Sequence, residues 1–178
     1  AGLRVAVVRH PMPYGDLAKQ AVQRFASLED MDRAGCTIEE REEYEPHVRS
    51  GKVVFAGVDY QRILRQAEAE AEVILWDGGN NDLPFFRPDL EIVLADPHRP
   101  GHERTYFPGE ANLLRADVIV LSKVDTARPG DIETVRASAA AANPRAIIAQ
   151  AAMPASVDRP ELLRERQPFR SHRSIAFG

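Results

Sequence analysis

Lys123 and Asp125 are the residues most suggestive of chemistry, in the string Ser122-Lys-Val-Asp125. A carboxylate in this place can accept two N–H hydrogen bonds from the edge of a guanine, and a lysine stem can lie flat over the ring. The tetrapeptide also occurs by chance as an ordinary strand-to-loop pair, but here it directly follows four apolar residues, 118–121. We therefore interpret Ser122, Lys123 and Asp125 as nucleotide-binding residues. Since loops of this type normally begin with Asn, Ser122 leaves both GTP and ATP open.

A second polar string, Asp77-Gly-Gly-Asn-Asn-Asp82, also follows an apolar run. An Asp at the end of a strand can hold Mg²⁺, which prefers one or two carboxylates plus phosphate oxygens. The glycines that follow would let backbone N–H groups approach a γ-phosphate. We predict Asp77 as a catalytic residue and metal ligand, and the alternative is a plain Gly-Asn turn. The remaining candidates in this string are Gly78 and Gly79 for the cofactor, Asp82 for catalysis, and Asn80 and Asn81 for the substrate.

The third string, Asp96-Pro-His-Arg-Pro-Gly-His102, places two histidines and one arginine within seven residues. His and Arg suit phosphate or carboxylate recognition and proton transfer. We predict His98 and Arg99 as catalytic residues and His102 as a substrate contact, against the alternative of a solvated loop. Glu110 and Asn112 follow and could reach back into this site, although helix capping alone would explain them equally well.

Arg9 and His10 form the fourth candidate, because they leave the first apolar run as a charged pair. We predict that both contact the substrate, and the alternative is a proline-rich turn. No Gly-x-x-x-x-Gly-Lys-Ser/Thr string occurs in the sequence, so a cradle for the α- and β-phosphates is missing. A truncated start would explain this absence.

The four polar strings can lie close together only if the strands and helices between them fold into a suitable arrangement. Continuous apolar runs, which are typical of strands buried on both faces, predict parallel strands at residues 3–8, 73–76, 91–95, 118–121 and 145–150. Helical patterns lie between them. We predict helices over 16–27, from Thr37 with a capping box, from Asp59 through the apolar series to Ala71, over 132–142, and from Arg159. Residues 84–88 and 97–108 are predicted to be proline-punctuated loops.

Strands that alternate with helices predict one doubly wound, mostly parallel sheet in a three-layer α/β domain. We place this domain at residues 1–166 and interpret 167–178 as a poorly ordered tail. In open α/β sheets, ligands bind at the carboxyl ends of the strands, where all four strings lie.

Composition excludes several classes of protein. The net charge of −4, from 23 basic and 27 acidic residues, argues against general nucleic-acid binding. No apolar stretch is long enough for a membrane helix, and no export signal is visible, so we expect no membrane partner and a cytoplasmic location. The single cysteine, Cys36, excludes an internal disulfide and is predicted to be structural or on the surface. Homo-oligomerisation stays open.

Taken together, these strings resemble the cyclic 2,3-diphosphoglycerate synthetase family and its bacterial GTPase-like relatives, over roughly residues 1–163. The Asp-Gly-Gly-Asn-Asn-Asp and His-Arg-Pro-Gly-His strings are the specific part of the resemblance. It implies a P-loop NTPase fold and ATP- or GTP-driven phosphoryl transfer with Mg²⁺. It also implies an anionic phosphorylated small molecule as second substrate.

This chain departs from the family in three ways. The phosphate-binding loop is absent, Ser122 replaces Asn, and the tail after Arg164 lacks the further strand and Gly-rich motif of the family. We therefore interpret the chain as the middle of a longer NTP-dependent ligase or hydrolase, without its first strand and phosphate loop. On its own it is predicted to have no NTPase activity. The alternative is a regulatory or metal-maturation GTPase switch.

Overall fold

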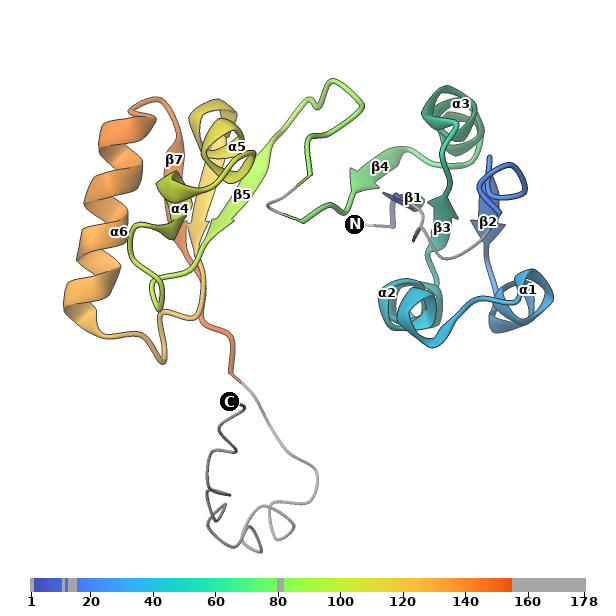
Figure 1. Ribbon diagram of the computed structural model, residues 1–178, viewed down its shortest axis with the longest axis horizontal. Helices are drawn as coiled ribbons and strands as arrows, with labels where there is room; N and C mark the ends of the chain where they lie inside the picture. Colours follow the sequence, from blue (N-terminus) through green and yellow to red (C-terminus); the bar gives the residue numbers. More distant parts are fainter. Residues whose placement is uncertain (1, 11, 13–15, 80–81, 155–178) are drawn as a thin grey trace, which may run out of the picture.

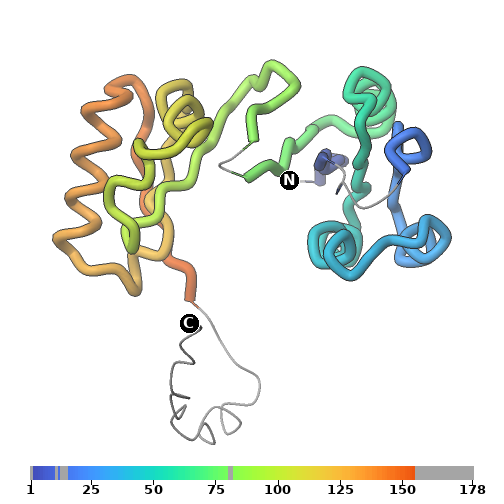
Figure 2. The backbone as a smooth tube through the Cα atoms, viewed as in Figure 1, coloured from blue at the N-terminus to red at the C-terminus, as the bar shows by residue number. Residues whose placement is uncertain are grey.

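The computed structural model describes residues 2–10, 12, 16–79 and 82–154, and it shows two α/β halves, each built on its own sheet (Figure 1). The first sheet has the order β2-β3-β1-β4 and the second has the order β5-β6-β7. The segment between β4 and β5 joins the halves, as the chain trace shows (Figure 2). The last predicted helix, from Arg159, and the tail after residue 166 lie outside the described residues.

The first sheet contains three parallel strands, β1 (Val5–Arg9), β3 (Val53–Ala56) and β4 (Val73–Trp76). Its edge strand β2 (Gln23–Phe25) runs antiparallel to β3. Helices α1 (Leu28–Ala34) and α2 (Ile38–Arg49) cover one face, where Met31 and Tyr44 pack against Val7 and Val54. Helix α3 (Tyr60–Glu70) covers the other face. This half therefore has the predicted three layers.

The second sheet is entirely parallel and comprises β5 (Ile92–Ala95), β6 (Val118–Leu121) and β7 (Ile147–Gln150). Helices α5 (Gly109–Arg115) and α6 (Pro129–Ala142) bury one face against residues such as Val93, Ile119 and Leu121. A short helix, α4 (His102–Thr105), precedes α5. On the opposite face, Ile92 and Ile147 are 56% and 68% exposed. This half therefore has two layers.

The α/β class and the mostly parallel pairing are confirmed, because four of the five strand pairs are parallel. The prediction of a single doubly wound sheet is wrong, since β4 and β5 belong to different sheets. The apolar runs of β5 and β7 suggested burial on both faces, but their outer residues stay exposed in the described part of the chain. No helix in the described ranges is long and apolar enough to cross a bilayer.

Local signals explain which elements were predicted. The helix from Thr37 begins with the predicted capping box, in which Thr37 and Glu40 cap each other's backbone N–H groups. Asp59 caps α3 as predicted. The helix over 16–27 is wrong, because residues 17–20 form turns and Phe25 enters β2 to stack on Tyr44. Strand β3 and helices α1, α4 and α5 were not predicted, and the predicted loop over 97–108 is wrong where α4 forms.

Candidate functional site

The first group of polar side chains lies where β1 and β4 end side by side. Arg9 is the last residue of β1, and Asp77 follows β4. An Arg9 Nη1 atom lies 2.7 Å from Asp77 Oδ2, and the Arg9 side chain is only 15% exposed. Two predicted residues from strands far apart in the sequence therefore form one ion pair. The reason is that parallel strands end at the same edge of a sheet.

Helix α2 adds two residues that the sequence analysis missed. His47 Nε2 lies 2.9 Å from Asp77 Oδ2, and Glu43 pairs with Arg9. Glu43 and His47 are four residues apart and so share one face of α2. The helix was predicted, and this i,i+4 pair was the signal available in the sequence. We call Arg9, Glu43, His47 and Asp77 the Asp77 cluster.

Electrostatics keep Asp77 ionised. Burial acts to raise the pKa of Asp77, but the His47 hydrogen bond and the Arg9 guanidinium outweigh it and hold the pKa below its ordinary value. No group of three metal-ligating side chains occurs among the described residues. Because Arg9 and His47 both occupy Asp77 Oδ2, the donor set here suits an ion pair better than a directly bound Mg²⁺.

The segment after β4 folds back beside this cluster. Asp82 Oδ2 lies 3.0 Å from His10 Nε2 and accepts the Gly79 backbone N–H at 3.2 Å. A Cβ at position 78 would lie 2.5 Å from Trp76 Nε1, so any other residue there would force the Trp76 ring to shift. His10, Gly78, Gly79 and Asp82 thus join the same region, while Asn80 and Asn81 lie outside the described residues.

A second group lies at the carboxyl ends of β5, β6 and β7. Lys123 Nζ is 2.8 Å from Asp96 Oδ2, and the His98 backbone N–H donates to Asp96 Oδ1 at 3.0 Å. Burial raises the pKa of Asp96, but the bonds from Lys123 and His98 prevail and lower it. His98 Nε2 lies 2.9 Å from Thr126 Oγ1. These contacts join the loops after β5 and β6, and we call this group the Lys123 network.

The predicted base-binding residues belong to this network. Ser122 is buried and its hydroxyl donates to the Ala95 carbonyl at 3.3 Å. Asp125 Oδ1 accepts the Met153 backbone N–H at 2.9 Å, which ties in the segment after β7. Lys123 adopts a left-handed backbone with φ of 55°, which is uncommon for a non-glycine residue and clusters at functional sites. Neither Thr126 nor Met153 was predicted, and no pattern in the sequence marks them.

Arg99 and His102 lie in the wall of a cavity between β5 and helices α4 and α5, which Asp96 of the Lys123 network also lines. Glu110 instead pairs with Arg104 at 3.2 Å. Asn112 is buried, and its amide donates to the Asp82 carbonyl at 2.8 Å. That bond connects the second half to the segment after β4.

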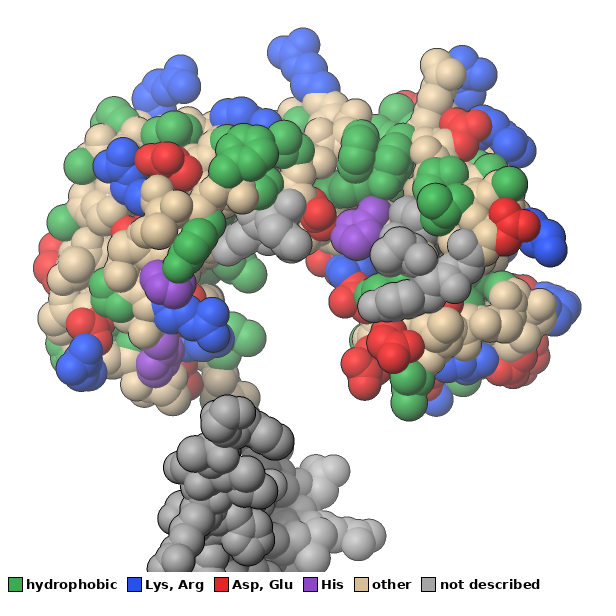
Figure 3. Space-filling model, viewed as in Figure 1, with side chains coloured by type: hydrophobic (Ala, Val, Ile, Leu, Met, Phe, Trp, Pro, Cys, Tyr) green, Lys and Arg blue, Asp and Glu red, His purple; other side chains and the backbone are tan. Residues whose placement is uncertain are grey.

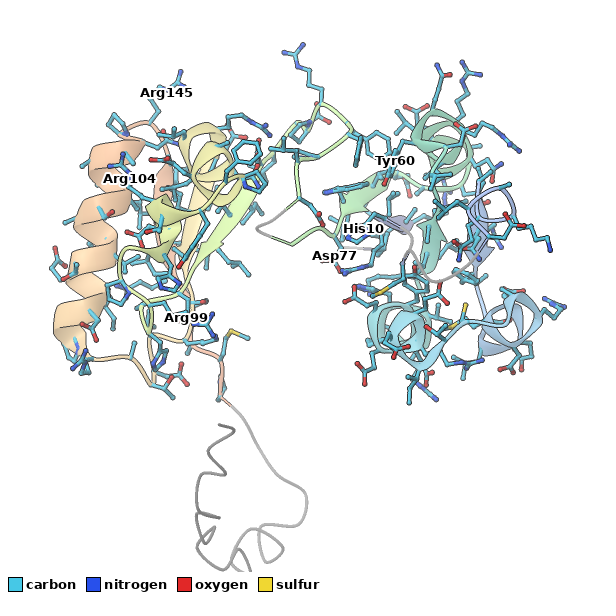
Figure 4. All side chains as sticks on the ribbon, viewed as in Figure 1. His10, Tyr60, Asp77, Arg99, Arg104 and Arg145 are labelled. Atoms are coloured by element: carbon cyan, nitrogen blue, oxygen red, sulfur yellow. The ribbon has the colours of Figure 1, made fainter. Side chains whose placement is uncertain are left out.

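The predicted residues therefore form two sites and not one. Figure 4 shows His10 and Asp77 close together in the first half, whereas Arg99 lies in the second half. The four strings do mark strand ends, but the strands belong to different sheets. Asp77 and Asp82 consequently lie apart from His98 and Arg99, with which they had been grouped as catalytic residues.

Comparison with known proteins adds one relative. The chain is 56% identical over 184 aligned positions to the arginine synthetase ArcE of Thermococcus kodakarensis. The alignment covers 99% of this chain but 41% of that protein, so the chain spans about two fifths of the relative's length. No family model matches the chain. The sequence is thus closely similar to part of a synthetase.

Proposed function

We propose that this chain is the base-binding part of an NTP-dependent synthetase whose product is arginine. We infer arginine as the product because the similar protein is an arginine synthetase. We infer nucleotide binding from the residues at the carboxyl edge of the second sheet. A synthetase joins two molecules at the expense of a nucleoside triphosphate. The similarity to such an enzyme favours this function over the GTPase switch.

The Lys123 network carries the proposal. It lies at the carboxyl edge of an all-parallel sheet, which is where α/β proteins bind ligands. One Asp125 oxygen accepts from Met153, and a carboxylate offers about four acceptor sites, so capacity remains for the N–H groups of a base. The Lys123–Asp96 pair holds the lysine in the loop beside it. These groups are fixed before any ligand arrives, and this lowers the entropic cost of binding.

In this proposal the chain positions the nucleotide and holds charge near it, as phosphoryl transfer generally requires. Mg²⁺ would accompany the phosphates and stays a prediction. The Asp77 cluster is internally paired, so an anionic group would reach Arg9 only by displacing Asp77 or Glu43. Resemblance to cyclic 2,3-diphosphoglycerate synthetases suggests a phosphorylated intermediate for such a site.

Binding of fluorescent GTP and ATP analogues to the chain tests the proposal. Asp125→Asn should weaken binding of the guanine analogue at least tenfold, because an amide cannot accept from both guanine N–H groups. It should strengthen binding of a xanthine analogue, whose extra carbonyl can accept from the new amide. Glu133→Gln, an exposed change on α6, is the matched control and should have no effect.

Two results would count against the proposal. One is equal binding of all nucleotides by the Asp125→Asn variant and the parent chain. The other is a loss of binding in Glu133→Gln as large as that in Asp125→Asn. Tighter binding of the ATP analogue than of the GTP analogue would support the nucleotide site but would identify its ligand as ATP.

A further inference from the structure

We infer that the cavity between β5, α4 and α5 binds a zwitterionic α-amino acid, with Arg99 on its carboxylate and Glu103 on its ammonium group. The inference deepens the proposed function and rests on it, because it names the place of the amino-acid substrate or product. We call this space the Arg99 cavity.

Size is the first argument. The Arg99 cavity has a volume of about 320 Å³, near the lower end of the roughly 300–1,000 Å³ typical of small-molecule sites. This volume suits an amino acid better than a whole nucleoside triphosphate. Its inner wall is apolar and comes from Val93, Ala95 and Leu113, all buried in the core of the second half.

Unpaired charge is the second argument. The Arg99 side chain is exposed, and no described residue pairs with its guanidinium. A guanidinium offers two parallel donors that match a carboxylate. Asp96 also lines the cavity, but Lys123 already neutralises it. Arg99 is therefore the cation that a carboxylate would meet.

Glu103 supplies the opposite charge. Its Oε2 accepts the Gly101 backbone N–H at 2.8 Å, which fixes the carboxylate in the wall. Its Oε1 is shielded from water and has no hydrogen-bond partner among the described residues. A buried acceptor without a partner is costly, and a donor entering the cavity would relieve that cost. An ammonium group is such a donor, while a phosphate would be repelled.

Aromatic groups at the rim complete the site. Tyr106 and Phe107 are 56% and 81% exposed, and His102 packs edge-on against Tyr106 with ring centres 5.1 Å apart. Their faces offer apolar contact for an aliphatic side chain. In the space-filling view, histidine and basic side chains gather beside hydrophobic ones on this half (Figure 3).

A second cavity holds two buried acceptors without partners, the neutral amide oxygens Gln20 Oε1 and Gln23 Oε1, but it lacks an unpaired charge among the described residues. It measures about 560 Å³ and lies beside β2 and α1, but its charged groups pair with other residues. Lys19 pairs with Asp16, Arg33 with Asp30, and Arg24 with Glu70. Glu40 also lines this cavity, and its carboxylate is held by hydrogen bonds from the Thr37 backbone N–H and the Gln20 amide. No charged group among the described residues is therefore left there without a partner.

Calorimetric titration with L-arginine tests the inference. The chain should bind L-arginine. It should bind two analogues at least tenfold more weakly: agmatine, which lacks the carboxylate, and Nα-acetyl-L-arginine, which lacks the ammonium group. Arg99→Gln should weaken L-arginine binding at least tenfold and leave agmatine binding unchanged. Glu103→Gln should likewise weaken L-arginine binding and leave Nα-acetyl-L-arginine unchanged.

Arg145→Gln is the matched control, since Figure 4 places Arg145 at the other end of the second half from Arg99. It should bind L-arginine like the parent chain, and thermal melts should show every variant folded. The inference is overturned if L-arginine does not bind, if Arg99→Gln binds it normally, or if inorganic phosphate displaces it. Nucleotide binding through Asp125, measured on the same samples, separates this failure from failure of the proposed function.

Discussion

The two halves differ in how they treat the polar groups at their strand ends. In the first half, Arg9, His47 and Glu43 close around Asp77 and leave the cluster internally paired. In the second half, Lys123 and Asp96 are paired, but the Arg99 guanidinium and Glu103 Oε1 line a cavity and have no partner in the described chain. Paired groups have already offset the cost of their desolvation, whereas unpaired groups gain most from a ligand.

The two sheets also differ in how completely helices cover them. Helices cover both faces of the first sheet, and one face of the second sheet is left exposed at Ile92 and Ile147. We therefore expect the first half to serve mainly the stability of the fold and the second half to serve mainly ligand binding. The comparison predicts that disruption of the first half will mainly change stability, and disruption of the second will mainly change binding.

The largest expected effects come from the separate cores. Phe55→Ala removes a fully buried ring from the first half and should cost roughly 3–5 kcal/mol of unfolding free energy. Ile119→Ala should cost roughly 2–5 kcal/mol in the second half. Native-state hydrogen exchange should show lost protection in the mutated half alone, because each half has its own core.

Equal loss of protection across both halves in either variant would show one cooperative unit and would break the comparison. An exposed change on α6, Glu133→Ala, is a control that should leave protection in both halves unchanged within about 0.5 kcal/mol.

The next effect concerns Asp77. Asp77→Asn weakens the contacts to Arg9 and His47, and should cost roughly 1–2 kcal/mol, a figure reduced for the 41% exposure of the carboxylate. Because the folded pKa of Asp77 is lowered, its stabilisation is present above the unfolded pKa near 3.8 and fades as pH falls through the lower folded pKa. Urea unfolding should therefore show parent and variant differing at pH 6 and converging as the pH falls from 3.8 through the lower folded pKa of Asp77.

Asp96→Asn, the corresponding change in the second half, should destabilise the protein less than Asp77→Asn does. Its partner Lys123 is 45% exposed, and the amide oxygen can still accept from His98, so the cost should be below about 1 kcal/mol. A larger loss for Asp96→Asn than for Asp77→Asn would reverse the assignment of the rigid and the binding half.

Sequence patterns predicted local structure better than assembly. The capping residues Thr37 and Asp59 and the apolar run of β6 are local signals, and each was placed correctly. Strand β2 depends on Phe25 stacking with Tyr44, a contact between residues 19 positions apart that no local pattern reveals. The split into two sheets depends in the same way on which strands pair.

The candidate sites show the same limit. The polar strings put Asp77, Lys123 and Asp96 at strand ends, and the structure has them there, after β4, β6 and β5. Parallel strands bring such ends together, while the functional roles of these residues stay predictions. The partners His47, Thr126 and Met153 come from elsewhere in the chain, and only the pair of Glu43 and His47 left a periodic signal. Glu103 lacks a distinguishing pattern, since its role depends on the cavity around it.

A smaller effect is expected at the side-chain hydrogen bond from Asn112 to Asp82, which links the two halves. Asn112→Ala removes the donor to the Asp82 carbonyl and should cost roughly 1 kcal/mol. It should also speed chymotryptic cleavage after the exposed Phe85, which lies in the segment that joins the halves. Asn143→Ala is the contrast, because Asn143 bonds only within the second half and should not speed this cleavage. Equal rates in both variants would mean that the Asn112 bond does not restrain the segment.

The smallest effect is chemical and concerns Cys36. Burial, helped by the charge of Glu40, raises the pKa of the Cys36 thiol to about 11, so little thiolate exists at pH 8. Iodoacetamide should label it many times more slowly than an exposed thiol, for which Cys36→Ala combined with Ala141→Cys on α6 is the reference. Phe55→Ala should accelerate Cys36 labelling, since it loosens the half that shields the thiol. Ile119→Ala should leave the rate of Cys36 labelling unchanged. Faster labelling in Ile119→Ala would show that the two halves do not open separately.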